Sequence, residues 1–255
     1  MAIKFEDYAQ NYRHARLERR NGILQVTLHS NGGELLWGMG PHEELSFLFG
    51  DIARDSENKV VILTGTGEAF CANPPAAASA MLPPSSWDRI YSDGKYLLMN
   101  HLSVEVPMIA AVNGPAFRHA ELAVLCDIVL ASENAAFQDS AHFTNGLVPG
   151  DGVHVVWPLI LGPNRGRYFL LTGQKLSAQE ALALGVVNEV LPRERLIPRA
   201  WELAQQIAAR PTLAVRYARG LLTQTLKRLM LDNLGYGLAL EGLSAGEHWP
   251  ASGPR

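Results

Sequence analysis

Three short apolar runs constrain the fold of this chain more than any other feature. They are VVIL at 60–63, MIAAV at 108–112 and IVLA at 128–131, and glycine or polar residues follow each of them. Continuous apolar runs of this length are typical of strands buried on both faces, as in parallel sheets. Helical spacing at 41–55 and 87–101 alternates with these runs. The pattern therefore predicts an α/β fold, in which chemistry tends to lie at strand ends.

Other local patterns place further elements. The alternation at 23–29 predicts a half-exposed strand, and the prolines, alanines and serines of 73–86 predict a loop. Ser177 precedes Glu180 by three residues, which is the spacing of a capping box that starts a helix. After Leu196 the spacing is helical, with a break at Arg210-Pro211.

The segment 108–152 carries most of the titratable side chains that lie next to apolar strands. It holds His119, Asp139, His142 and Asp151, and Glu241 stands alone in the apolar C-terminal run. A carboxylate in apolar surroundings is buried, paired or part of a site, because desolvating its charge is costly. These residues are therefore the first candidates for chemistry.

Bulk properties exclude some classes of function. The 255 residues suit one α/β domain, with or without a helical appendage. A net charge of −3 and a pI near 6.2 give no electrostatic signature for nucleic acid or an anionic membrane. Two cysteines without CxxC spacing, a polar N-terminus and the lack of a membrane-length apolar run favour a reduced, cytoplasmic setting.

The order of motifs resembles the crotonase (enoyl-CoA hydratase/isomerase) superfamily. The resemblance implies repeated ββα units that form two roughly perpendicular sheets, with a core at 1–195 and a C-terminal helical trimerisation or lid region at 196–255. Homotrimers or dimers of trimers are expected. The segments that carry the resemblance are VVILTGTGEAFCA at 60–72, VPMIAAVNGPA at 106–116, ELAVLCDIVLAS at 121–132, GLVPGDG at 146–152 and LTGQKLSAQEALALGVVNEVL at 171–191.

The chain departs from the usual pattern at the coenzyme A site. Asn73-Pro74-Pro75 replaces the usual Gly-x-Asp, and Phe117-Arg118-His119-Ala120 replaces the Gly-rich turn that donates an oxyanion-hole N–H. The position of the first hydratase glutamate is held by Glu121, and His142 takes that of the second. We therefore expect neither coenzyme A binding nor the usual pair of amide donors.

This combination resembles one branch of the superfamily, the coenzyme-A-independent β-diketone hydrolases typified by 6-oxocamphor hydrolase. The matching segments are LLW at 35–37, NGPAFRHAE at 113–121, FQDSAHF at 137–143, VPGDGVHVVWP at 148–158 and NRGRYFLLTGQ at 164–174, together with Glu241. The resemblance implies retro-Claisen cleavage of a cyclic or bicyclic 1,3-diketone by water. It implies no cofactor and no metal, while the charge balance argues against a nucleic-acid or membrane partner.

The resemblance also assigns roles to individual residues. His142 is expected to be the base for water and Asp151 its partner carboxylate, with Glu241 holding the water or returning a proton. His119 is expected to hydrogen-bond the carbonyl that becomes the enolate, and Trp37 to donate to the same oxygen. The remaining pocket residues are expected to be Trp87, Ala72 and Phe117.

Each role has a structural alternative. His142 or Trp37 would serve equally well in a core, Asp151 in a turn, His119 as a helix cap, and Glu241 paired with an arginine. Glu121 is either a structural hydrogen-bonding group or a remaining acid/base group. A coenzyme-A-dependent hydratase or isomerase is the first rival function, and a non-catalytic binding protein is the second. The natural diketone, its ring size and the product stereochemistry are not encoded in these patterns.

Overall fold

A mostly parallel β-sheet forms the centre of the protein. The computed structural model describes residues 3–72 and 84–248 of the chain. The sheet has six strands in the order β1-β2-β3-β4-β5-β8, antiparallel between β1 and β2 and parallel elsewhere. Its strands are β1 (Ala15–Arg20), β2 (Ile23–Leu28), β3 (Val60–Gly65), β4 (Met108–Val112), β5 (Ile128–Ser132) and β8 (Glu189–Leu191).

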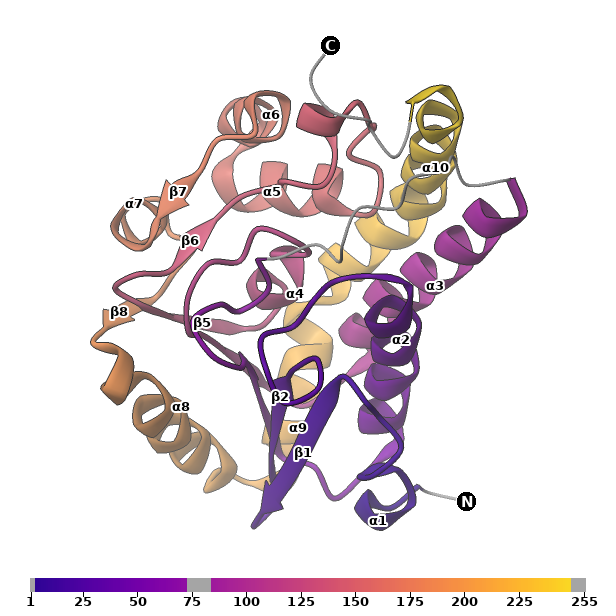
Figure 1. The fold of residues 1–255 in the computed structure, drawn as a ribbon. Coiled ribbons are helices and arrows are strands. Elements are labelled where there is room, and N and C mark those ends of the chain that lie inside the picture. The colour runs from indigo at the N-terminus through magenta and orange to yellow at the C-terminus, as the bar shows by residue number, and fades with distance from the viewer. Residues whose placement is uncertain (1–2, 73–83, 249–255) are drawn as a thin grey trace.

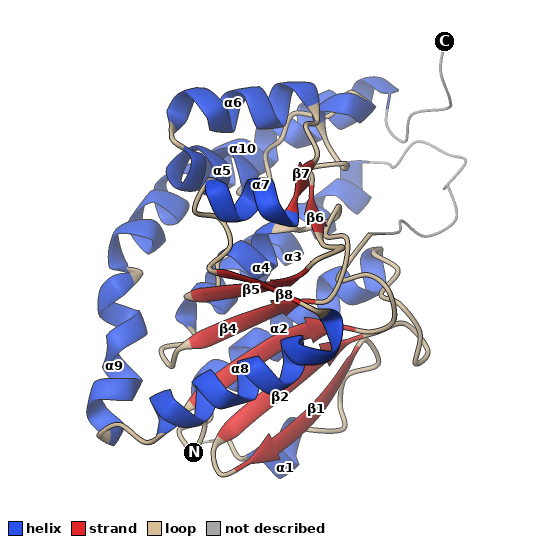
Figure 2. Cartoon of the chain, turned by 90° about the vertical axis from the view of Figure 1, so that its left-hand side faces the viewer, coloured by secondary structure: helices blue, strands red, loops and turns tan. Residues whose placement is uncertain are grey.

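Helices cover both faces of this sheet. Figure 2 shows α8 lying across one face, with α2 and α3 on the other. The helices are α1 (Phe5–Tyr8), α2 (Met39–Arg54), α3 (Pro84–Ser103), α4 (Glu121–Val124), α5 (Val153–Leu161), α6 (Pro163–Thr172), α7 (Ala178–Ala183), α8 (Arg193–Ala208), α9 (Thr212–Leu222) and α10 (Gln224–His248), with a 3-10 turn, η1, at Phe143–Asn145. None of the described helices combines the length and the apolar character needed to cross a membrane.

Alternate residues of the central strands explain why the apolar runs are continuous. In β3, Val61 and Leu63 join the large core on the α2 and α3 side. Val60 and Ile62 join a second core, to which α8 contributes Leu196, Ala200 and Ala204. Both faces are dry, so neither face tolerates polar side chains at these positions. The expected α/β fold with strands at the three apolar runs is confirmed.

The strand at 23–29 differs from expectation. Its side chains were predicted to be half exposed, but most of β2 is buried. α8 covers the outer face here, and Trp201 Nε1 donates a 2.7 Å hydrogen bond to Gln25 Oε1. The polar residue in the alternation is thus satisfied by a helix 176 residues away rather than by water. β1, whose charged sequence gave no strand signal, pairs with β2 along its whole length.

A second, smaller layer lies above the main sheet and carries the loops of interest. It consists of β6 (Ala136–Phe137) and β7 (Leu176–Ser177), extended by bridges that join Cys71, Ala116 and Phe137. Figure 1 shows α10 running beside α3, with α5 next to it. The predicted capping box of Ser177 and Glu180 starts α7, and the predicted break at Pro211 separates α8 from α9. The division at 195/196 stays a prediction.

Candidate active site

Four of the predicted site residues meet at one place in the fold. His119 precedes α4, His142 precedes the η1 turn, Asp151 precedes α5 and Glu241 lies in α10. His142 Nε2 lies 3.3 Å from Asp151 Oδ2 and 3.4 Å from Glu241 Oε1. His119 Nδ1 lies 3.6 Å from the same oxygen of Asp151. Asp151 therefore stands between two imidazoles.

Two glycines allow α10 to bring Glu241 to this cluster. A Cβ atom added to Gly150 would lie 2.1 Å from the carbonyl oxygen of Gly237, and one added to Gly237 would lie 2.3 Å from that of Gly150. Only residues without a side chain permit such a close approach of a helix to a loop. The contact brings Glu241 next to Asp151, although the two residues lie far apart in the chain.

His142 differs from the sequence-based expectation in its main carboxylate partner. Its Nδ1 lies 2.7 Å from Oδ1 of Asp139, a residue to which the sequence gave no role. Asp151, which was predicted to be the partner, faces the other ring nitrogen together with Glu241. The only sequence signal for Asp139 was its place three residues before His142 in the segment FQDSAHF at 137–143.

Glu121 holds the second imidazole of the cluster. It is 1% exposed, and its Oε1 lies 2.5 Å from Nδ1 of His119. Trp37 packs against the same imidazole, with ring centroids 3.9 Å apart and planes tilted by 32°. His119 is thus held by a carboxylate and an indole face, in a backbone conformation with φ of +46°. Such left-handed backbone at a non-glycine residue is uncommon and gathers at functional sites.

The turn that carries His119 uses its own amide groups internally. The N–H groups of Phe117 and Arg118 both donate to the carbonyl oxygen of Cys71, at 2.8 and 3.0 Å. Neither amide is therefore directed at a ligand in this conformation. Asn73-Pro74-Pro75 and the rest of the predicted loop up to residue 83 lie outside the described residues.

The other predicted pocket residues make contacts outside the four-residue cluster. The indole N–H of Trp87 donates to the carbonyl oxygen of Leu238 at 3.2 Å, so its ring packs on α10. The ring of Phe117 lies 4.5 Å from Nζ of Lys175. Ala72 is half-buried at the edge of the described segment. Their roles in binding substrate remain predictions.

Electrostatics at the cluster are dominated by the competition between burial and opposite charge. Burial opposes the charged form of His142, but Asp151, Asp139 and Glu241 outweigh it and hold the pKa of His142 well above its usual range. Burial would raise the pKa of Asp151, but His142 and His119 lower it. For Glu241, burial prevails over His142 and the pKa is raised. Asp151 and Glu241 are thus buried at one site, but their pKa values are shifted in opposite directions.

The cluster also contains atoms that could serve as ligands to a metal ion. Those of His142, Asp151 and Glu241 lie within 4.8 Å of one another, and so do those of His119, Glu121 and Asp151. Both sets need Asp151, and its Oδ2 is already in ion-pair contact with both imidazoles. The expectation of a metal-free site remains a prediction.

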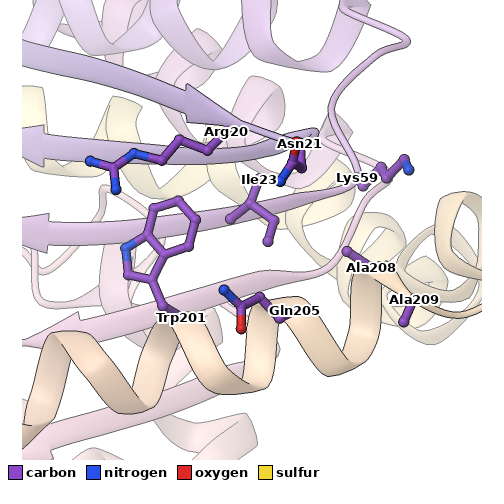
Figure 3. Close-up of a pocket in the computed structure, with 8 residues that line it drawn as sticks. All are labelled: Arg20, Asn21, Ile23, Lys59, Trp201, Gln205, Ala208 and Ala209. Carbon is purple, nitrogen blue, oxygen red and sulfur yellow. The ribbon is translucent and has the colours of Figure 1, made fainter.

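The cluster is separate from a surface hollow in the described part of the chain. Figure 3 shows this hollow, of about 480 Å³, between α8 and the turn that joins β1 to β2. Its lining includes Arg20, Lys59, Trp201 and Gln205. Among the described residues that line it there is neither a carboxylate nor a histidine, so it lacks an acid/base pair.

Comparisons with known proteins agree with the fold and show the family. A family model described as enoyl-CoA hydratase/isomerase matches residues 18–235. The short-chain-enoyl-CoA hydratase of Clostridium acetobutylicum is 30% identical over 233 residues, which cover 91% of this chain and 87% of that protein. The carnitinyl-CoA dehydratase of Salmonella enteritidis is 34% identical over 207 residues, 78% of this chain and 76% of that protein.

Solved structures add a second kind of relative. A β-diketone hydrolase from the cyanobacterium Anabaena sp., bound to (S)-3-oxocyclohexyl acetic acid, is 50% identical with a TM-score of 0.92. The similarity covers 94% of this chain and 97% of that one. An enoyl-CoA hydratase/isomerase from Mycobacterium paratuberculosis is 28% identical with a TM-score of 0.83, covering 92% and 94% of the two chains.

Proposed function

The chain belongs to the enoyl-CoA hydratase/isomerase family, and we propose that within it this protein hydrolyses a carbon–carbon bond of non-enolisable 1,3-diketones. The observation that carries the proposal is the position of His142, whose Nε2 faces two buried carboxylates. Similarity to a β-diketone hydrolase supports it, since the ligand of that protein is a keto acid. Ring opening of a cyclic 1,3-diketone by water gives a compound of this class.

The first step is the attack of water on one carbonyl carbon. His142 accepts a proton from the water as its oxygen bonds to that carbon, and Glu241 holds the water through its carboxylate. Asp151 stabilises the imidazolium that forms, because its charge lies 3.3 Å from Nε2. The position of three carboxylates around one imidazole favours proton uptake at this ring.

The second step breaks the bond between the attacked carbonyl carbon and the central carbon. Its electron pair forms an enolate on the other carbonyl, while the attacked carbon becomes the carboxyl carbon. His119 donates to the enolate oxygen as the imidazolium, because Glu121 and Asp151 outweigh the effect of burial and raise the pKa of His119. The indole N–H of Trp37 assists it. A side-chain donor is needed here because the amides of Phe117 and Arg118 are already bonded to Cys71.

In the last step the proton that His142 took from the water passes to Glu241, whose Oε1 lies 3.4 Å from Nε2, and from Glu241 to the central carbon. The raised pKa of Glu241 favours its holding this proton. One water is consumed: its oxygen and one hydrogen end on the carboxyl group, and the other hydrogen ends on carbon. This reaction needs no nucleotide or thioester. The substrate we propose is a cyclic or bicyclic diketone, taken up by a homotrimer or a dimer of trimers in the cytoplasm.

Hydration of an enoyl-CoA is the second candidate. The hydratase and dehydratase relatives favour it, and Glu121 stands at the position of the first hydratase glutamate. Its contact with His119, however, gives this carboxylate a partner that it would have to release to act as an acid or base. A non-catalytic binding role is opposed by the cost of burying His142, Asp151 and Glu241 together.

Incubation with a series of 2,2-disubstituted cyclohexane-1,3-diones and bicyclic diketones tests the proposal directly. We expect loss of diketone and appearance of keto acid by NMR, with the rate lowered about 10²–10⁴-fold in the His142→Ala variant. Crotonyl-CoA, assayed in parallel for hydration and for protection against heat, separates the rival function. Hydration of crotonyl-CoA without diketone turnover would replace the proposal, and inertness toward both would favour the binding role.

A further inference from the structure

The two ring nitrogens of His142 face different carboxylates at different distances. Nδ1 lies 2.7 Å from Oδ1 of Asp139, a normal hydrogen-bond length. Nε2 lies 3.3 Å from Asp151 and 3.4 Å from Glu241, beyond a close hydrogen bond. The ring is therefore fixed at Nδ1 and less tightly engaged at Nε2.

This arrangement selects one tautomer of the neutral imidazole. An ionised carboxylate accepts hydrogen bonds and cannot donate, so Asp139 requires the proton to sit on Nδ1. Nε2 then carries the lone pair that a base needs, on the side of Asp151 and Glu241. The side chains of His142 and Asp139 are 5% and 3% exposed, and this exclusion of water strengthens their interaction.

The segment around Asp139 is held by other bonds as well. The side-chain amide of Asn145 donates to the carbonyl oxygens of Ser140 and Ala141, at 2.6 and 3.4 Å. The backbone N–H groups of Asn145 and Leu147 donate to the carbonyl oxygen of His142. The backbone of the segment therefore has its own supports. Oδ1 of Asp139 also accepts from the N–H of Ala141 at 3.3 Å, but its shorter contact, 2.7 Å, is the one with the imidazole.

We propose that Asp139 is the positioning residue of His142, which orients the ring and keeps Nε2 unprotonated in the neutral form. This rests on the proposed function, in which His142 is the base. Asp151 then has a different role. It faces Nε2, where it stabilises the positive charge that forms on His142, and the same carboxylate oxygen also contacts His119. The pair His142 and Asp139 matches the base and orienting group of hydrolytic triads, in which a carboxylate holds the distal nitrogen.

Replacement of Asp139 by asparagine has two predictable consequences. The amide NH₂ can donate to Nδ1, which stabilises the tautomer protonated at Nε2, and that tautomer cannot accept a proton from water. The loss in kcat should then be about 10²–10⁴-fold, as in other enzymes with a mis-set tautomer. One negative charge is also removed, while Asp151, Glu241 and His119 still face His142. The pKa of His142 should fall, and the acidic limb of the rate profile should move to lower pH.

The test compares Asp139→Asn, Asp139→Glu and the loop control Asn145→Ala. Rates with a turned-over cyclohexane-1,3-dione are measured against pH, and the imidazole of His142 is titrated by NMR with ¹⁵N-labelled histidine. We expect an Nδ1–H tautomer in the wild type, a lower His142 pKa and a shifted profile in Asp139→Asn, and partial rescue of the rate in Asp139→Glu. Asn145→Ala should loosen the loop without moving the profile.

Some results would overturn the proposal. A neutral wild-type His142 protonated at Nε2 would do so, and so would equal rate losses in Asp139→Asn and Asn145→Ala without a shift in either profile. The NMR titration needs no substrate and covers the wild type and Asp139→Glu even where Asp139→Asn fails to fold. Failure of the hydrolase function would thus show as absent turnover, and failure of the positioning role as a wrong tautomer.

Discussion

Two buried charged clusters in this protein differ in the partners that they give their charged groups. Arg219 of α9, with no exposed side-chain surface, ion-pairs with Asp127 at 2.9 Å and donates to the carbonyl oxygens of His101, Val104 and Leu125. The cluster around His142 instead leaves carboxylate oxygens of Asp139, Asp151 and Glu241 without a hydrogen-bond partner among the described residues.

We propose that this difference separates a structural cluster from a catalytic one. At Arg219 the side chain supplies donors to backbone carbonyls at the end of α3 and after α4, which ties α9 to the core. At His142 the open acceptors surround an imidazole, an arrangement that costs stability unless a ligand or a water satisfies it. The charge of Arg219 thus has a carboxylate and three backbone carbonyls as partners, whereas carboxylate oxygens at His142 stay open for a ligand.

Replacement of Arg219 should produce the largest effect on stability. Arg219→Met removes the donors of three buried carbonyls and the partner of Asp127, so we expect a loss of about 3–5 kcal/mol in the free energy of unfolding. Urea denaturation measures this, with Arg228→Met as the control for loss of an arginine, expected within about 0.5 kcal/mol of wild type. A small loss of unfolding free energy in Arg219→Met would show that the hydrogen bonds of Arg219 contribute little to the packing of α9 on the core.

Replacement at the His142 cluster should spare stability and remove activity. We expect His142→Ala and Asp151→Asn each to lower kcat by about 10²–10⁴-fold, as loss of a general base or of the charge that supports it should. His29→Ala, outside the cluster, serves as the control for loss of an imidazole. Near-normal rates in both cluster variants would refute the assignment of this cluster to catalysis.

Removal of His119 should have a smaller effect on the rate. One donor to the enolate oxygen contributes about 2.7–4 kcal/mol, so His119→Ala should lower kcat by about 10²–10³-fold with the fold intact. Single-turnover kinetics would place the loss in the cleavage step. An unchanged rate would mean that the imidazole of His119 only contacts Trp37 and Glu121 and takes no part in the reaction.

The smallest expected effect is the change of the wild-type kcat/KM with pH. A base must be unprotonated, and the pKa of His142 lies well above its usual value because of its three carboxylates. We therefore expect kcat/KM to rise with pH through and above neutrality, about tenfold per unit below that pKa. A rate that is flat from about pH 6 to about pH 9 would contradict His142 as the base.

Much of the fold could be predicted from local patterns. The apolar runs of β3, β4 and β5 are continuous because both sheet faces are dry, and that requirement is visible in the residues themselves. The capping box of Ser177 and the break at Pro211 are local in the same sense. The strand β1 and the burial of β2 were missed because they depend on pairing and on α8, which is remote in sequence.

The sequence by itself determined the fold class, the family resemblance and the set of candidate groups His119, His142, Asp151 and Glu241. The tertiary structure alone decided how these groups pair. A residue's type sets what its side chain can donate or accept, but Asp139 and Asp151 offer the same carboxylate and both lie near His142 in the chain. Which of them meets Nδ1 and which meets Nε2 is fixed by the loop before η1 and by the contact of Gly150 with Gly237, and those are properties of packing in three dimensions.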